Sequence, residues 1–371
     1  MTETGTTGMG TARTRPATGT EPDTGTGTGT GTEPATELDA APGGDPAAFE
    51  RLVAGHRREL LAHCYRMLGS VQDAEGALRE TLLAAWRGLA GFDGRASPRG
   101  LLYRIATDAC LRMIERRPGG AGRVLPADHG PARRGTDDIG VFVPGPVWLE
   151  PLPDELLDRL PADAYDDPAA SYQRREAIEL AFVAALQQLP GTQRAVLVLR
   201  EVLGFSAAEV SAVLETTEAS VHSALQRARC TVEARMPTSS QRIELAALGA
   251  DGRDTLVERF VTAFESGDVP AILSLLAEDA RLTMPPLPAW FDGRAEIGRF
   301  LDLRMFGTPW KLLPLRANSQ LAFACYQGDE DGTRYPLSAV NLVTVHAGLI
   351  TEITGFLYPG MYRHFPVPAE L

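Results

Sequence analysis

Apolar residues recur at helical spacing in two separate blocks of the chain, and residues three or four apart share one face of an α-helix. In the first block, residues 46–118, the spacing predicts three amphipathic helices. Ser97 before Pro98 suits the start of the third helix, because serine caps free N–H groups and proline fits the first turn. The periodic positions are Phe49, Leu52, Val53, His56, Leu60 and Cys64, then Leu78, Leu82, Ala85, Trp86 and Leu89, then Leu102, Ile105, Ala109 and Met113.

The second block, residues 168–237, has the same periodicity and predicts four helices. Ser206 and Glu209 have the spacing of a capping box at the start of the third helix, and Thr217 is a plausible N-cap of the fourth. Only a short turn separates these two helices. This is the outline of a helix-turn-helix, a motif whose second helix enters the major groove of DNA.

The pattern changes in residues 251–371, where helices come first and strands follow. Helices are predicted at 255–266, 269–276 and 295–303, and strands at 280–284, 310–315, 321–326, 337–345 and 350–358. This order predicts a separate α+β domain with a curved antiparallel sheet. The chain is therefore expected to be multidomain, with two all-α domains followed by an α+β domain.

Two segments lack sustained periodicity. Residues 1–45 alternate threonine and glycine, a composition that cannot bury enough apolar surface to fold, so we expect a disordered tail. Residues 119–167 are rich in proline, glycine and acidic side chains and are expected to form a linker. Within the linker, Trp148 belongs to a short apolar island, and a tryptophan in such a place is expected to dock on a folded surface.

Composition restricts the location and the chemistry. The 371 residues are 44% hydrophobic with a formal net charge of −12, so nucleic-acid binding would depend on local basic faces. No apolar run reaches membrane-spanning length, and the N-terminus does not resemble a signal peptide, so we expect a soluble cytoplasmic protein. We expect no cofactor and no metal site, because Cys64, Cys110, Cys230 and Cys325 lack zinc-ligand spacing, and His56 and His63 lie about 10 Å apart along one helix.

The fourth helix of the second block carries the strongest candidate DNA surface. Its apolar stripe of Val221, Leu225, Ala228 and Val232 should face the core. Arginine, glutamine and serine side chains on the other face could contact base edges or phosphates, although a solvated helix with no partner would look the same. The candidate DNA-binding residues are Ser220, His222, Ser223, Gln226, Arg227 and Arg229.

The sequence resembles the extracytoplasmic-function (ECF) class of RNA polymerase sigma factors, in the subgroup with a fused C-terminal SnoaL-like domain. The resemblance is carried by residues 56–70, 73–75, 80–86 and 102–111 in the first block and by 189–197 and 223–229 in the second. It implies a sigma region 2 domain at 46–118, a region 4 helix-turn-helix domain at 168–237 and a SnoaL-like regulatory domain at 251–371. The implied partners are RNA polymerase core and promoter DNA, with an unidentified small ligand for the C-terminal domain.

The resemblance also implies roles for single residues. Asp73, Glu75 and Glu80 fall on the surface that binds polymerase in the family. Residues 92–97 match a loop that captures a flipped base, and neighbouring arginines and aromatic rings would bind single strands. The alternative is that Trp86 and Tyr103 are core residues, which we expect for Trp86. The arginines are Arg95, Arg99, Arg104, Arg112, Arg116 and Arg117, and the implied interdomain regulatory residues are Trp148, Leu149, Glu150 and Pro151.

The sequence departs from the family pattern at Gly76, Arg79 and Asp108, which makes polymerase affinity and promoter strength harder to anticipate. Two alternative functions remain: a ligand-responsive helix-turn-helix regulator that does not use polymerase core, and a SnoaL-type cyclase or isomerase with DNA-binding appendages. Residues that could serve such an enzyme form no recognised catalytic pair, so we expect no catalytic activity. They are His346, His364, Asp292, Trp290, Tyr326 and Asn341.

Overall fold

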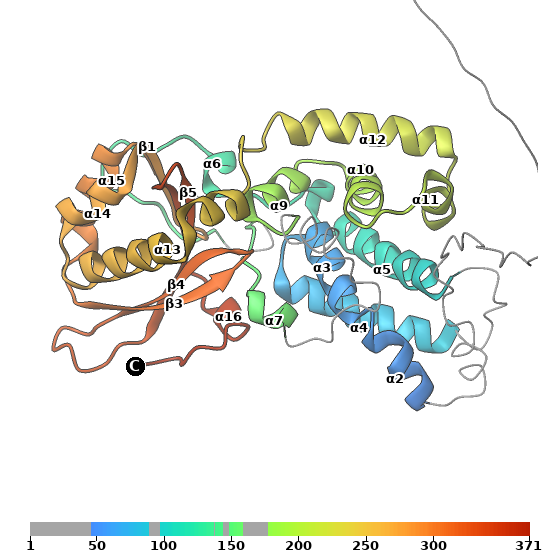
Figure 1. Cartoon of the computed structure of the whole chain (residues 1–371), viewed down its shortest axis with the longest axis horizontal. Helices are drawn as coiled ribbons and strands as arrows, with labels where there is room; N and C mark the ends of the chain where they lie inside the picture. Colours follow the sequence, from blue (N-terminus) through green and yellow to red (C-terminus); the bar gives the residue numbers. More distant parts are fainter. Residues whose placement is uncertain (1–45, 89–96, 137, 144–147, 159–176) are drawn as a thin grey trace, which may run out of the picture. The chain divides into compact units, whose positions relative to one another are not determined.

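The computed structural model describes residues 46–88, 97–136, 138–143, 148–158 and 177–371 (Figure 1). The predicted N-terminal tail, Arg95 and most of the loop at 92–97 lie outside the described residues. Within the described ranges, no helix is both long and apolar enough to cross a bilayer.

The described residues of the first block form four helices where three were predicted: α2 (Pro46–Ala54), α3 (Arg57–Leu68), α4 (Val71–Gly88) and α5 (Pro98–Glu115). The first predicted helix divides at a turn, yet its apolar stripe continues through the turn, because Val53, His56 and Leu60 are all buried. Ser97 caps α5 by accepting a hydrogen bond from the Gly100 N–H, as the sequence predicted.

The second block contains the four predicted helices: α9 (Leu180–Gln187), α10 (Gly191–Leu197), α11 (Ala207–Val213) and α12 (Glu218–Glu233). Helix α10 continues into a π-helical turn, η3 (Val198–Val202). The predicted capping box at Ser206 and Glu209 and the N-cap at Thr217 are both confirmed. The helix-turn-helix outline is therefore present in α11 and α12.

The C-terminal domain begins earlier than the strand and helix pattern indicated. Helix α13 (Gln241–Glu265) starts at an N-cap on Ser240, and the left-handed backbone of Gly249 (φ 70°) interrupts it. Two short helices, α14 (Val269–Leu275) and α15 (Arg294–Phe300), follow, the second running into the π turn η4 (Leu301–Met305). Shorter helical segments are η2 (Pro118–Gly120), α6 (Pro126–His129), α7 (Asp154–Asp158) and α16 (Pro359–Tyr362).

Six strands form one open sheet in the order β2-β1-β6-β5-β4-β3. The sheet is mixed, because β1 and β6 run parallel while the other neighbouring strands are antiparallel. Helices lie between β1 and the later strands, which allows the chain to return in the same direction. The strands are β1 (Leu276–Thr283), β2 (Trp290–Asp292), β3 (Trp310–Ala317), β4 (Gln320–Gln327), β5 (Leu337–His346) and β6 (Leu349–Phe356).

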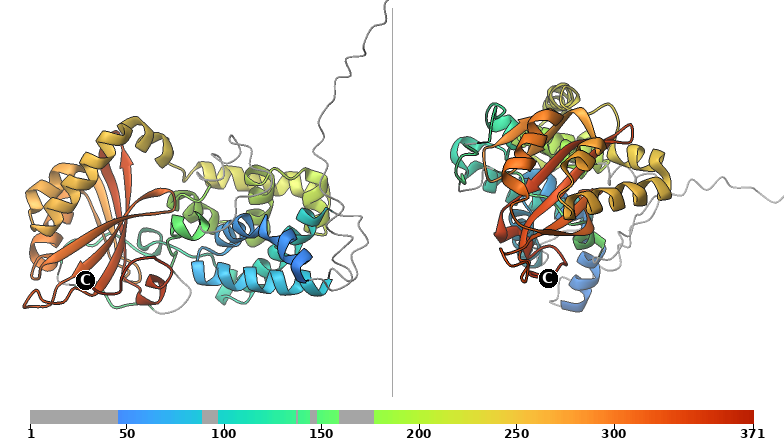
Figure 2. Two further views of the ribbon diagram at one scale, coloured as in Figure 1. Left: turned by 60° about the horizontal axis from the view of Figure 1, so that its bottom comes forward. Right: turned by 90° about the vertical axis from the view of Figure 1, so that its left-hand side faces the viewer.

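Each face of this sheet is buried against a different partner. One face packs on α13 and α15 (Figure 2). Buried aromatic rings that include Phe260, Phe291 and Phe323 fill this interface. On the other face, Val340 and Phe356 belong to the same hydrophobic core as the two helical domains. The sheet is therefore continuous with the core of the helical part, and burial of this apolar surface stabilises their association.

Candidate nucleic-acid interface

Helix α12 presents the polar face that the sequence predicted. Val221, Leu225, Ala228 and Val232 are buried, and the opposite face is open to solvent. Arg229 forms an ion pair with Glu201 at 2.7 Å. The structure exposes every residue of the candidate DNA-binding set on this helix, namely Ser220, His222, Ser223, Gln226, Arg227 and Arg229.

The arginines of α5 fall into two groups. Arg104, Arg112 and Arg116 are exposed, and Arg112 pairs with Glu80 at 2.7 Å. Arg99 instead faces the second helical domain, where it donates a hydrogen bond to the Leu203 carbonyl at 2.9 Å. Its guanidinium also lies 4.3 Å from the centre of the Phe205 ring, a cation–π geometry.

The two aromatic residues of this domain have different environments. Tyr103 is fully buried, and its hydroxyl donates to Glu59 at 2.8 Å. Trp86 is 37% exposed and rests edge-on against Phe49, with ring centres 5.1 Å apart. Of the two, Trp86 retains a surface that a base could contact.

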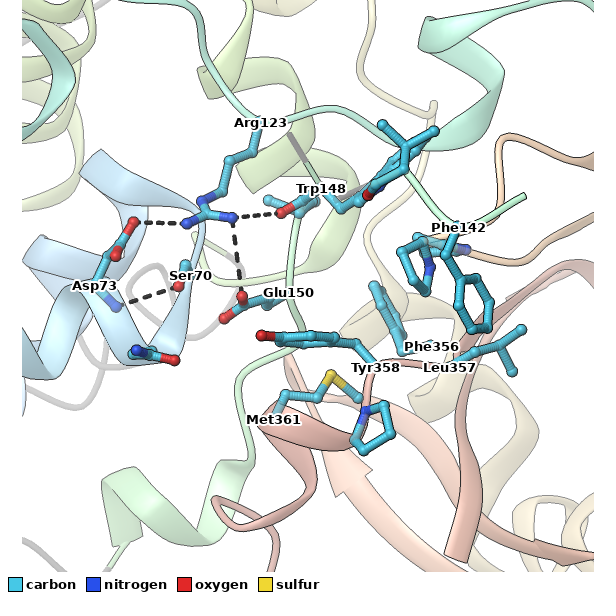
Figure 3. A pocket seen from close by; sticks show the side chains of 16 residues that line it. Ser70, Asp73, Arg123, Phe142, Trp148, Glu150, Phe356, Leu357, Tyr358 and Met361 are labelled. Atoms are coloured by element: carbon cyan, nitrogen blue, oxygen red, sulfur yellow. Dashed lines mark hydrogen bonds and ion pairs between the residues drawn. The ribbon is translucent and has the colours of Figure 1, made fainter. Parts of the chain in front are cut away.

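Asp73 is the centre of a small charge cluster (Figure 3). One of its oxygens accepts hydrogen bonds from Arg117 at 2.9 Å and from Arg123 at 2.6 Å. Arg117 also donates to the Leu68 carbonyl at the end of α3, and burial followed by the nearby Arg123 charge lowers its pKa. The linker thus supplies one arginine, and the end of α5 the other, to a carboxylate at the start of α4.

The other two carboxylates of the candidate polymerase surface also face cations or a histidine of this chain. Glu75 lies 3.7 Å from the ring of His364, near the C-terminus of the chain. Burial lowers the pKa of His364, while the Glu75 charge opposes that shift. Glu80 pairs with Arg112, so each of the three carboxylates contacts a partner within this chain.

The two helical domains are joined at the carbonyl end of α3. Arg194 of α10 is fully buried and donates to the carbonyls of Met67 and Leu189. The Gln187 side chain donates to the Arg66 carbonyl at 3.1 Å. Unpaired carbonyls at a helix end attract cations and donors, which explains this arrangement. Burial and the charge of Arg117 lower the pKa of Arg194 to about 9.

The apolar island of the linker is docked on the first helical domain. Trp148 is 6% exposed and Leu149 is 1% exposed. The Glu150 N–H donates to the Gly69 carbonyl at 3.0 Å, and its own carbonyl accepts from the Tyr65 hydroxyl at 2.8 Å. Pro151 is buried beside it, so the four residues are held by both packing and backbone hydrogen bonds.

The turn between β3 and β4 is a contact that the sequence analysis missed. Asn318 and Ser319 have φ angles of 53° and 58°, the conformation of a two-residue type I′ hairpin, which asparagine tolerates. The buried Asn318 amide donates to the Tyr65 hydroxyl at 2.8 Å and to the Ile178 carbonyl at 2.6 Å. Its oxygen accepts from the Leu152 N–H at 2.8 Å. One side chain therefore links α3, the linker and the segment before α9.

A second junction lies next to this turn. The buried Gln320 accepts a hydrogen bond from the Leu180 N–H at 2.8 Å, at the start of α9. Glu179 accepts from the N–H groups of Gln241 at 2.9 Å and Arg242 at 3.1 Å, at the start of α13. A pair of strand-like runs separated by Asn-Ser could have indicated the hairpin, but not what it touches.

The residues considered for catalysis do not converge. His346 contacts Glu244 at 2.9 Å on the surface, and Asp292 lies 3.7 Å from Arg281. Trp290 and Tyr326 donate to the carbonyls of Gly130 and Pro368, as structural residues do. Asn341 is buried in β5, and His364 is the neighbour of Glu75. Three or more potential metal ligands do not gather anywhere in the described ranges.

Three family models match the chain. Sigma-70 region 2 matches residues 52–118, Sigma-70, region 4 matches residues 174–230, and a SnoaL-like domain matches residues 257–353. The first two cover most of the helical blocks and the third covers most of the sheet domain.

Known proteins are similar over much of the chain. The chain is 38% identical over 321 residues to the ECF RNA polymerase sigma factor SigG of Mycobacterium tuberculosis, a match that covers 85% of this chain and 83% of that protein. It is 28% identical over 228 residues to SigJ of the same organism, which covers 61% of this chain and 62% of SigJ. The crystal structure of SigJ matches in fold with a TM-score of 0.55 at 22% identity, over 87% of this chain and 100% of that chain.

Proposed function

This chain belongs to the ECF RNA polymerase sigma factors, and from that premise we propose how its parts share the work of transcription initiation. As a sigma factor it binds RNA polymerase core and directs promoter recognition, and it is not an enzyme. The polymerase and the promoter are in the bacterial cytoplasm, so the chain acts there. The alternative functions considered from the sequence do not account for a region 2 and a region 4 in one chain.

The exposed face of α12 reads the upstream promoter element as duplex DNA. Its position as the second helix of the helix-turn-helix, with Gln226 and Arg227 exposed, supports this assignment. On α5, Arg104, Arg112 and Arg116 contact the single-stranded part of the promoter. Arg99 and Arg117 become available to DNA only after they leave their present protein partners.

The C-terminal domain holds the two helical domains together in a closed arrangement that competes with polymerase. The observation that carries this proposal is Asn318, a C-terminal-domain side chain hydrogen-bonded to α3, to the linker and to the chain before α9. Promoter recognition needs the two helical domains to reach separate elements. Opening must therefore break the contacts of Asn318 and of Arg194.

The same closed arrangement occupies the carboxylates that the polymerase would use. Asp73 is neutralised by two guanidinium groups, and Glu75 faces His364 of the C-terminal domain. Core polymerase has to displace these partners, and the His364 contact exists only while the C-terminal domain is docked, so the closed form binds core less tightly than the open form. Trp148 to Pro151 link the C-terminal domain to the end of α3, because Trp148 and Glu150 line one cavity with Phe356 while the Glu150 backbone bonds to Gly69 and Tyr65.

Transcription in vitro from a genomic fragment library tests the proposal. Purified core polymerase is assayed with and without the chain, and new start sites that share two spaced upstream elements are expected. Start sites that share only the element melted into single strands, with no common upstream element, would refute the assignment of α12 to the upstream element. Loss of core binding in the variant Glu80→Ala, whose ion pair with Arg112 is exposed, with an unchanged melting profile, would support the polymerase surface.

A further inference from the structure

A cavity of about 440 Å³ opens where three parts of the chain meet (Figure 3). The start of α4, the linker and the end of the sheet domain each contribute to its wall. This volume is typical of pockets that bind drug-sized molecules. The helix-facing side of the sheet, in contrast, is filled by buried rings such as Phe260 and Phe264.

Four aromatic side chains form much of the wall. Trp148 and Phe356 are buried, whereas Phe142 is 59% exposed and Tyr358 is 48% exposed. Large apolar side chains left exposed beside a cavity are typical of a binding surface. Aromatic walls favour a planar ring system, which can pack on ring faces and edges.

The opposite end of the cavity is polar and holds an unsatisfied acceptor. The Glu150 carboxylate is nearly buried, at 13% exposure, and the guanidinium of Arg123 lies 3.8 Å from it, beyond hydrogen-bond distance. Within the described ranges its buried oxygen Oε2 has no hydrogen-bond partner. A carboxylate withdrawn from water without a donor is unfavourable, so a ligand that donates a hydrogen bond here would be favoured.

The charges around the cavity disfavour an anion. The charged side chains of its wall are two carboxylates, Asp73 and Glu150, and one guanidinium, that of Arg123. Asp73 is already satisfied by two arginines, which leaves Glu150 as the group that selects the ligand. A neutral donor satisfies Glu150 without adding like charge, whereas a carboxylate would be repelled.

We infer that this cavity binds a neutral planar aromatic compound carrying a hydroxyl or amino hydrogen-bond donor. The rings lie between Phe142 and Tyr358 and the donor faces Glu150. A molecule bound there touches all three parts of the wall, so its occupancy stabilises the closed arrangement and opposes core binding. This regulatory step rests on the proposed function, whereas the binding site does not.

Calorimetric titration of the full chain with three naphthalene probes tests the site. We expect 2-naphthol to bind, and 2-methoxynaphthalene and 2-naphthoate to bind at least about tenfold more weakly, because one lacks the donor and the other is an anion. The variants Phe142→Ala and Glu150→Gln should each weaken 2-naphthol binding roughly tenfold. Val141→Ala is the matched control, since Val141 is 80% exposed and is not part of the wall.

Equal affinity for the three probes, unchanged affinity in both wall variants, or no binding of 2-naphthol would overturn the site. Core binding is then measured with and without saturating 2-naphthol. Weaker core binding supports the coupling, whereas selective probe binding with unchanged core binding refutes the coupling and leaves the site intact. Failure of the closed-arrangement proposal itself is detected separately, by variants of Asn318 that leave the cavity wall unchanged.

Discussion

Replacing Asn318 with alanine should release the C-terminal domain from the helical domains. The side chain makes three hydrogen bonds and is fully buried. Its loss leaves the buried Leu152 N–H and the Ile178 carbonyl without these partners, at a cost of about 1–3 kcal/mol for each group left unsatisfied. The left-handed backbone at φ 53° adds roughly 1 kcal/mol for alanine.

The two unsatisfied groups together cost about 2–6 kcal/mol, and this cost falls on the closed arrangement, because both hydrogen bonds exist only while the domains are docked. The backbone cost stays with the β3–β4 turn in either state. A weakening of about 2 kcal/mol or more shifts a two-state equilibrium at least about thirtyfold toward the open form. We therefore expect Asn318→Ala to bind core polymerase more tightly and to initiate transcription at lower concentrations than the unmodified chain. Fluorescence anisotropy with labelled core measures the affinity, and run-off transcription measures the output.

Ser319→Ala is the matched control, because Ser319 has the same left-handed backbone but contacts its neighbours through main-chain atoms. Asn318→Gly isolates the hydrogen bonds, since glycine carries no backbone penalty there. The reasoning is refuted if Asn318→Ala keeps its melting profile and binds core with the affinity of the Ser319→Ala control.

Three further predictions concern stability and DNA recognition. Gly76→Ala should raise the free energy of unfolding by about 0.5–1 kcal/mol, because an added Cβ in α4 meets nothing within 4 Å. Gly69→Ala should lower it, because the Cβ would lie 2.8 Å from Leu149 and Gly69 has a φ of 66°. Thermal melts compare the two variants. If Arg227 contacts a base, Arg227→Ala should weaken duplex promoter binding by about 1–3 kcal/mol without changing how steeply the affinity falls with salt. If it contacts a phosphate, the slope of log affinity against log salt concentration should decrease by about one. Titrations at several salt concentrations distinguish the two contacts. Burial, aided by the Arg66 charge, lowers the pKa of His63 to about 3. The His63 ring therefore stays neutral in the folded chain, whereas in the unfolded chain it takes up a proton below about pH 6.5. Stability should then fall from pH 6.5 toward pH 3 by up to about 1.4 kcal/mol per pH unit for this group, and urea titrations of His63→Gln should show a shallower pH dependence.

Local patterns were sufficient for the features that depend on neighbouring residues. The capping box at Ser206, the cap at Thr217 and the exposed face of α12 follow from spacing within one or two helices. Helix α13 was placed too late because Gly249 breaks the periodicity, although the residues on both sides of it are helical. The parallel pairing of β1 with β6 could not be predicted, since it joins strands that are far apart in sequence.

The contacts between domains were also inaccessible from the sequence. Arg123 lies 50 residues from Asp73, and Asn318 lies 253 residues from Tyr65. Nothing in the local sequence specifies such partners, because each of these polar side chains would suit a solvated surface equally well. The docking of Trp148 was anticipated only because a tryptophan in a polar linker is costly to leave in water.

The most direct test of the closed arrangement is the distance between α4 and α12 with and without polymerase. Cys230 is exposed on α12, whereas Cys64, Cys110 and Cys325 are buried and should not react with a spin label. The variant Arg79→Cys therefore carries one label at Cys230 and a second on the exposed surface of α4. Pulsed electron–electron double resonance should show one short label-to-label distance for the free chain. A second population with a longer distance should grow as core polymerase is added. Unchanged distances at saturating core would contradict the proposal that this sigma factor must open to work.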